Sequence, residues 1–136
     1  MIAAQPPSPD LTGKLAVITG ASRGLGRRAA VRLAAHGATA LLVARTESAL
    51  AETARTIQSR GGGGAVVLPA DLSDPSVVDN LKASARQHGR ASILVNAAGV
   101  FGPIQMIKDS DPHLWINTQM LNTVAPTSPV APSCPT

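Results

Sequence analysis

Three glycines near the start of the chain constrain the fold more than any other feature. Gly20, Gly24 and Gly26 directly follow the apolar run Lys14–Thr19 and precede a segment with helical periodicity. Because glycine has no Cβ, backbone amides in such a turn can approach a diphosphate closely, and the amino end of the next helix favours negative charge. A strand, a glycine turn and a helix in this order are typical of a dinucleotide-binding unit. The alternative for a glycine pattern alone is an ordinary tight turn.

Each glycine of this turn has its own expected part in the predicted site. We expect Gly20 to form the bend, Gly24 to leave room for the ligand, and Gly26 to let the helix pack closely on the strand. The other residues of the predicted binding turn are Ser22, Arg23 and Leu25.

Four short apolar runs alternate with helical patterns along the chain. They are bounded by turn residues, as buried strands are, and cover residues 14–19, 39–44, 65–69 and 92–96. Since parallel strands need crossovers and bury both faces, this alternation predicts an α/β fold, a Rossmann-type doubly wound parallel sheet that is incomplete at four strands. Right-handed crossovers predict the strand order 3-2-1-4, with a ligand crevice at the carboxyl ends where strands 1 and 4 diverge.

Apolar residues at helical spacing mark the expected inward faces of the helices. These faces are Leu25, Ala29 and Leu33 in the first helix, Leu50, Ala54 and Ile57 in the second, and Val77, Val78, Leu81 and Ala85 in the third. Thr46 is the expected cap of the second helix, Asp74 with Pro75 begins the third, and Asp111 with Pro112 begins a fourth.

Length and composition indicate one globular domain. The 136 residues are 44% hydrophobic and 15% charged, which does not suit a disordered chain. We expect a flexible lead-in at residues 1–10, a partial dinucleotide-binding domain at 11–125 and a proline-rich tail at 126–136. One cysteine, Cys134, cannot form an internal disulfide, and no apolar run reaches the roughly 18 residues of a membrane span. We therefore predict a cytoplasmic protein without a membrane anchor.

The formal net charge of +4 does not by itself indicate a nucleic-acid partner. The basic residues are dispersed along the chain, and no aromatic residue is interleaved with them. The tightest basic group is Arg23, Arg27, Arg28 and Arg32, of which the last two best fit a solvated helix face. We therefore predict no nucleic-acid partner.

The end of the second strand predicts which nicotinamide cofactor binds. In dinucleotide folds an acidic residue there accepts from the ribose 2′-hydroxyl, and it would repel a 2′-phosphate. Here the strand ends in Val43, Ala44 and Arg45, and a guanidinium can bind a phosphate through two parallel hydrogen bonds. With Arg23 nearby, the pattern favours NADP(H), although each arginine alone also fits a solvated loop charge.

Four motifs, taken in order, resemble the short-chain dehydrogenase/reductase family. They are the glycine turn, Asp71-Leu72 after the third strand, Asn96-Ala97-Ala98-Gly99 after the fourth strand, and Trp115 followed by Asn122. The resemblance runs from about Leu11 to Ala125.

This resemblance implies further site residues. Asp71 and Leu72 would contact the adenine, while Asn96, Ala97 and Gly99 would hold the central sheet and line the nicotinamide ribose. Asn122 matches a helix asparagine that helps to anchor a proton-relay water in the family, which makes it the one catalytic candidate. Taken singly, Asp71 also fits a loop cap, Asn96 a strand-end turn and Asn122 a helix-surface amide.

The sequence departs from the family where the reaction takes place. Ala97 replaces the second asparagine of the family motif, and Ser92 replaces an aspartate before the fourth strand; both changes are mild. Family members also use a serine, a tyrosine and a lysine four residues after that tyrosine. This chain has no tyrosine, and its last lysine is Lys108.

Other residues do not replace the missing groups. Ser128 and Ser133 lie in the proline-rich tail, and nothing in the sequence places a proton-transfer partner beside His113 or Cys134. We predict no metal site.

Two interpretations stay open. In the first, the chain is a fragment, the NADP(H)-binding portion of an oxidoreductase whose full-length parent transfers a hydride between the nicotinamide and a carbonyl or secondary alcohol, as ketoreductases do. In the second, it is a non-enzymatic nucleotide-binding or interaction protein. In both, the uncovered edge of the fourth strand, with Ile93, Leu94 and Val95, predicts self-association.

Overall fold

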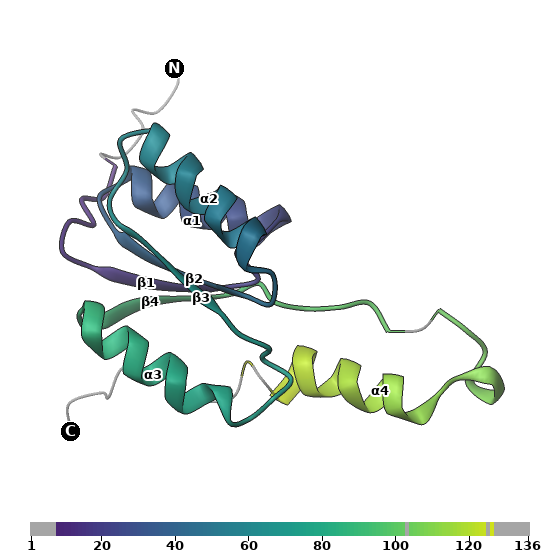
Figure 1. The fold of residues 1–136 in the computed structure, drawn as a ribbon. Helices are drawn as coiled ribbons and strands as arrows, with labels where there is room; N and C mark the ends of the chain where they lie inside the picture. The colour runs from purple at the N-terminus through teal and green to yellow at the C-terminus, as the bar shows by residue number, and fades with distance from the viewer. Residues whose placement is uncertain (1–7, 103, 125, 127–136) are drawn as a thin grey trace, which may run out of the picture.

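Four parallel strands form one sheet in the order β3-β2-β1-β4 (Figure 1). The strands are β1 (Leu15–Thr19), β2 (Thr39–Ala44), β3 (Ala65–Pro69) and β4 (Ala91–Asn96). Thr19 pairs in register with Val43 on one side and Asn96 on the other, so that three strands finish at the same edge. The predicted Rossmann-type fold and its strand order are confirmed.

The computed structural model describes residues 8–102, 104–124 and 126. Most of the predicted lead-in and nearly all of the predicted proline-rich tail, including Ser128, Ser133 and Cys134, lie outside these residues.

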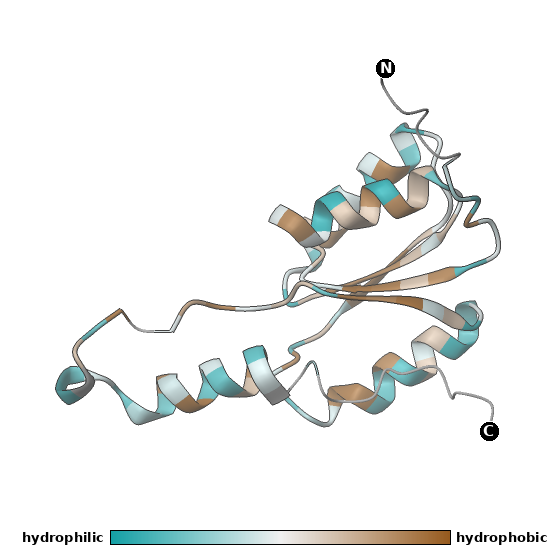
Figure 2. Ribbon diagram, turned by 180° about the vertical axis from the view of Figure 1, so that it is seen from behind, coloured by the Kyte–Doolittle hydropathy of each residue, from teal (hydrophilic) through white to brown (hydrophobic). Residues whose placement is uncertain are grey.

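The sheet separates two apolar layers, because alternate residues of each strand point to opposite faces. On one face, Ile18 and Leu42 pack with α1 (Gly24–Ala35) and α2 (Glu47–Ser59). On the other, Val17 and Leu41 pack with Leu81 and Ala85 of α3 (Val77–His88). Figure 2 shows these strands as largely apolar segments between helices along which hydrophilic and apolar residues alternate. The helices thus cover both faces, as the alternation of elements predicted.

The inward face of α1 differs from the prediction. The buried residues are Gly26, Ala30 and Ala34, one position further along than the expected face, and Leu25 is 75% exposed. A Cβ atom at position 26 would overlap the carbonyl oxygen of Gly20, so the helix must turn this glycine toward the strand end. Small residues therefore lie closest to the sheet. Leu33 of the expected face does pack partly buried against the same core, so apolarity alone misplaced mainly the first turn of the inward face.

The start of α3 also differs from the prediction. Asp74 and Pro75 form a tight turn before the helix. In this turn the Val77 amide donates to the Asp74 carbonyl, and the Val78 amide donates to the Pro75 carbonyl. The Asp74 side chain accepts from the Ser76 amide at 2.9 Å, so its capping bond lies before the helix instead of in its first turn. Leu81 and Ala85 are buried as expected.

Beyond β4 the chain leaves the sheet and forms an arm. A short turn, η1 (Ile107–Asp109), precedes α4 (Pro112–Gln119), which continues as the π-helical turn η2 (Met120–Val124). Asp111 begins α4 as predicted, since its side chain accepts from the His113 amide at 2.8 Å. Figure 1 shows α4 beyond the carboxyl ends of the strands. Among the described residues, none of the helices has the length and apolarity to cross a membrane.

The packing of α1 predicts that Gly26→Ala destabilises the fold by about 3 kcal/mol, although alanine favours helices, because the new methyl group meets rigid backbone. Chemical denaturation measures the change in the free energy of unfolding. Gly61→Ala is the matched control: its φ of +65° is strained, but no atom lies within 4 Å of the added Cβ. Gly61→Ala should lower the free energy of unfolding by only about 1 kcal/mol. Equal losses of stability in the two variants would contradict the overlap between a Cβ at position 26 and the backbone of Gly20.

Candidate functional site

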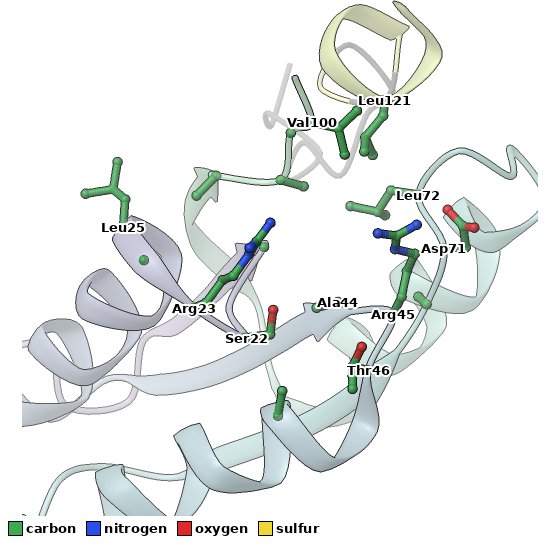
Figure 3. A pocket seen from close by; sticks show the side chains of 17 residues that line it. Ser22, Arg23, Leu25, Ala44, Arg45, Thr46, Asp71, Leu72, Val100 and Leu121 are labelled. Carbon is green, nitrogen blue, oxygen red and sulfur yellow. The ribbon is translucent and has the colours of Figure 1, made fainter. Parts of the chain in front are cut away.

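A cleft of about 470 Å³ opens at the carboxyl edge of the sheet (Figure 3). Its walls come from the turn after β1 and from the ends of β2, β3 and β4. Ten of the predicted cofactor residues line it: Gly20, Ser22, Arg23, Gly24, Leu25, Arg45, Asp71, Leu72, Ala97 and Gly99. Gly26 and Asn96 do not line the cleft; Gly26 packs beneath it against Gly20, and Asn96 pairs with Thr19 in the sheet.

The glycine turn leaves space where a ligand would need it. Gly20 has a φ of +66°, and a Cβ there would lie 2.5 Å from the carbonyl oxygen of Ala97. Gly24 also has a positive φ, +57°, but a Cβ there would meet no atom within 4 Å. The first glycine is thus required by the protein itself, whereas the second faces open space in the cleft.

Thr19 joins the ends of β1 and β4, a role that the sequence analysis missed. Its hydroxyl oxygen accepts from the amides of Ala97 and Ala98, both at 3.2 Å, and its hydroxyl group donates to the carbonyl of Val95 at 3.4 Å. The side chain is only 5% exposed. It therefore holds the turn after β4 against the glycine turn. The signal in the sequence was a polar residue at the end of a buried apolar run.

Thr53 is a second buried hydroxyl that the sequence analysis missed. It lies on the inward face of α2, between Leu50 and Ile57, and is fully buried. Its hydroxyl donates to the carbonyls of Ala21, at 3.0 Å, and Ala49, at 3.2 Å. The Ala21 amide also donates to the Val43 carbonyl, so the glycine turn is hydrogen-bonded both to β2 and to α2.

Two guanidinium groups enter the cleft from different elements. Figure 3 shows Arg23 in the glycine turn and Arg45 after β2, both directed into the cleft. Within the part of the chain that the structure describes, neither forms a salt bridge. Thr46 occupies the expected N-cap position of α2, but its side chain makes no capping hydrogen bond and lines the cleft instead.

Asp71 brings a negative charge to the same cleft. The Ser73 hydroxyl donates to its carboxylate at 2.7 Å and the Ser73 amide at 3.0 Å. These bonds hold the pKa of Asp71 below its ordinary value, and the nearby charge of Arg45 lowers this pKa further. The carboxylate is therefore ionised at neutral pH and stands beside a guanidinium.

Asn122 lies on η2, and its side chain is paired with backbone. The side-chain oxygen accepts from the Val100 amide at 2.9 Å, and the side-chain nitrogen donates to the Val100 carbonyl at 2.7 Å. Nearby, a Cβ at Gly99 would lie 3.2 Å from the Asn122 oxygen. Asn122 thus joins the helical arm to the turn after β4, and the neighbouring Leu121 lines the cleft. Its catalytic role stays a prediction.

No group of three or more His, Cys, Asp or Glu side chains gathers where it could hold a metal ion, as far as the described residues extend. What the cleft offers is backbone amides, two arginines and apolar walls. Such an arrangement suits a phosphate-bearing organic ligand.

The chain matches a model of the short chain dehydrogenase family over residues 14–134. This match continues past Ala125 into the proline-rich segment. Among curated proteins, a fatty acyl-CoA reductase from Acinetobacter baylyi is 43% identical over 95 residues, which are 66% of this chain and 30% of that protein. The chain spans about a third of the length of the curated relatives that it matches.

Solved structures with the same fold include two with a bound cofactor. A metagenomic short-chain oxidoreductase in complex with NADP has a TM-score of 0.82 and 34% identity, over 87% of this chain and 53% of that one. L-sorbose reductase from Gluconobacter frateurii, in complex with NADPH and L-sorbose, has a TM-score of 0.79 and 36% identity, over 85% of this chain and 44% of that one.

The buried hydroxyl of Thr53 leads to a stability prediction. Thr53→Val keeps the shape of the side chain but removes its hydroxyl donor, so the buried Ala21 carbonyl loses a hydrogen bond. The free energy of unfolding should therefore fall by about 1–2 kcal/mol. Thr118→Val is the control, because the Thr118 hydroxyl donates only to Leu114 within its own exposed helix. Chemical denaturation of both variants is the measurement. A Thr53→Val protein as stable as the control would show that the bond contributes nothing.

Proposed function

Because the chain belongs to the short-chain dehydrogenase family, we propose that its cleft binds NADP(H) and that the chain is the cofactor-binding portion of an oxidoreductase. The observation that carries this proposal is the glycine turn, which opens onto a cleft that two arginines enter. Each part of the cofactor has a matching group of residues.

The diphosphate would lie on the glycine turn at the amino end of α1. Backbone amides from Ser22 to Gly26 and the helix dipole favour an anion there. Gly24 supports this position, since the space that a side chain would fill is open. No acidic residue lies in the first turn of α1 to oppose the charge.

The 2′-phosphate of the adenosine would lie between Arg45 and the start of α2. The guanidinium of Arg45 can form paired hydrogen bonds to a phosphate, and Arg23 approaches from the other side of the cleft. The Thr46 hydroxyl has no capping partner in its own helix, which leaves it available to the same group. The residue directly after β2 is Arg45 and not an acidic residue that could accept from a free 2′-hydroxyl, and so the arrangement favours NADP(H) over NAD(H).

The organic rings of the cofactor would cover apolar surface. Asp71 and Leu72 would contact the adenine, and Ala97 and Gly99 would line the nicotinamide ribose. Leu25 is 75% exposed on the rim of the cleft, and a bound ligand would bury part of it. Burial of a leucine side chain gains roughly 1.5–3 kcal/mol.

The cofactor supplies hydride chemistry when it is bound. In the full-length parent, a small carbonyl or secondary alcohol would exchange the hydride with the nicotinamide. The 136 residues contain no tyrosine, and no lysine follows Lys108, so the pair that transfers the proton in the family is not among them. We propose that this chain binds the cofactor but does not turn over substrate by itself. Cofactor binding without turnover also fits the alternative of a non-enzymatic nucleotide-binding protein.

The proposed 2′-phosphate site predicts that Arg45→Asp weakens NADPH binding at least about tenfold more than NADH binding, because the variant loses paired hydrogen bonds and gains a repulsive charge. Isothermal titration with each cofactor measures the two dissociation constants. Arg55→Asp is the matched control, since it makes the same charge change on α2 away from the cleft lining. Equal losses for the two cofactors would refute the assignment.

The missing tyrosine and lysine predict that the purified chain oxidises no NADPH above background with a panel of ketones and aldehydes. Loss of NADPH absorbance is the measurement, and titration of NADPH into the same preparation checks that the cleft is folded. Turnover with any carbonyl would overturn our account of the chemistry.

A further inference from the structure

The positive charge of the chain comes from one segment. Residues 24–60 contain six arginines and two glutamates, which account for the whole formal net charge of +4. The remaining residues contain six basic and six acidic side chains. Basic residues are therefore spread along the chain, but their net excess over acidic residues comes from residues 24–60, the segment that runs from the start of α1 past the end of α2. Of the six arginines, only Arg45 lines the cofactor cleft.

Four of these arginines line one groove. A groove of about 500 Å³ runs along the outer side of α1 and α2, and it is lined by Arg27, Arg28, Arg32 and Arg60 over a floor that includes Val31 and Thr56. The two helices lie side by side on one face of the sheet (Figure 1), and Arg28, Arg32 and Arg60 are exposed. This groove is separate from the cofactor cleft, with which it shares only Gly24 among the lining residues.

Most of the charge in this groove has no counter-ion. Arg27 is bound to the Glu52 carboxylate at 3.0 Å and to the Thr56 hydroxyl at 3.2 Å. Arg28, Arg32 and Arg60 make no salt bridge with any side chain in the described residues. Arg28 and Arg32 also stand one helical turn apart, where like charges repel each other. An anionic partner would relieve this repulsion.

The composition of the groove limits the partner. Arginines make up half of its lining residues, and among the described residues no acidic side chain lines it, so it suits an anionic partner. No aromatic residue lines it, so it lacks the stacking surfaces on which single-stranded nucleic acids depend. Two arginines one turn apart on α1 match carboxylates one turn apart on a second helix that lies alongside.

We propose that the groove between α1 and α2 is a docking surface for an acidic helix of a partner protein. Arg28 and Arg32 bind carboxylates from one wall, and Arg60 binds from the other. Arg27 stays bound to Glu52 and shapes the floor.

A labelled synthetic helical peptide with glutamates one turn apart tests this docking surface, with the full chain and fluorescence anisotropy at low salt. We expect the glutamate peptide to bind and a peptide with glutamines in their place not to bind. Added salt should weaken the binding, because the contacts lie at the surface. The Arg28→Gln/Arg32→Gln variant should bind roughly tenfold more weakly, as expected for two lost exposed charge contacts.

The Arg86→Gln/Arg90→Gln variant is the matched control, since it loses the same charge at the end of α3 and just beyond it, away from the residues that line the groove. It should bind the peptide like the unchanged protein, and thermal unfolding should show that both variants are folded. Equal weakening in both variants would show that only net charge matters and would overturn the proposal. Absence of binding by the glutamate peptide would also overturn it, as would tighter binding of single-stranded DNA that is lost in the Arg28→Gln/Arg32→Gln variant. None of these results depends on NADPH.

Discussion

The close approach of α1 to the carboxyl end of β1 is the constraint on which the rest of the structure depends. Gly26 lies against the carbonyl of Gly20, and Gly20 in turn lies against the backbone of Ala97 after β4. Neither glycine can carry a side chain without moving backbone. Because three segments meet there without side chains between them, the amino end of α1 points at the edge where the strands finish, and a cleft forms beside it.

Two buried hydroxyl groups hold this junction in place. Thr19 joins the glycine turn to the turn after β4, and Thr53 joins it to α2. Both hydroxyls bond to backbone and are almost fully buried, so each satisfies polar groups that would otherwise be costly to bury. Through them, the segments proposed to bind the diphosphate, the 2′-phosphate and the nicotinamide ribose become parts of one hydrogen-bonded unit.

The sequence was sufficient to predict the features that depend on local pattern. Apolar runs and glycine stops predicted all four strands, the right-handed crossover rule predicted their order, and a glycine turn after the first strand predicted which edge carries the cleft. The rotation of α1 could not be predicted in this way, because it depends on the close contact of Gly26 and not on apolar periodicity. Thr53 was missed for a related reason, because a hydroxyl that bonds to distant backbone looks, in sequence, like any exposed threonine. Thr19 differs in standing at the end of a buried apolar run, but the backbone amides that it binds are far away in the sequence.

The distribution of charge on α1 is consistent with this architecture. A helix is ordinarily stabilised by acidic residues near its amino end, yet the first turn of α1 has none, and Arg27 and Arg28 follow close behind. This arrangement costs some helix stability but keeps the potential around the glycine turn positive. A positive potential attracts anions from a distance and raises their rate of association. The same helix therefore favours an anion at its amino end through backbone amides and along its outer side through arginines. Among the lining residues, the cleft and the groove share only Gly24. A change in the outer arginines can therefore alter the groove while the geometry of the cleft is kept.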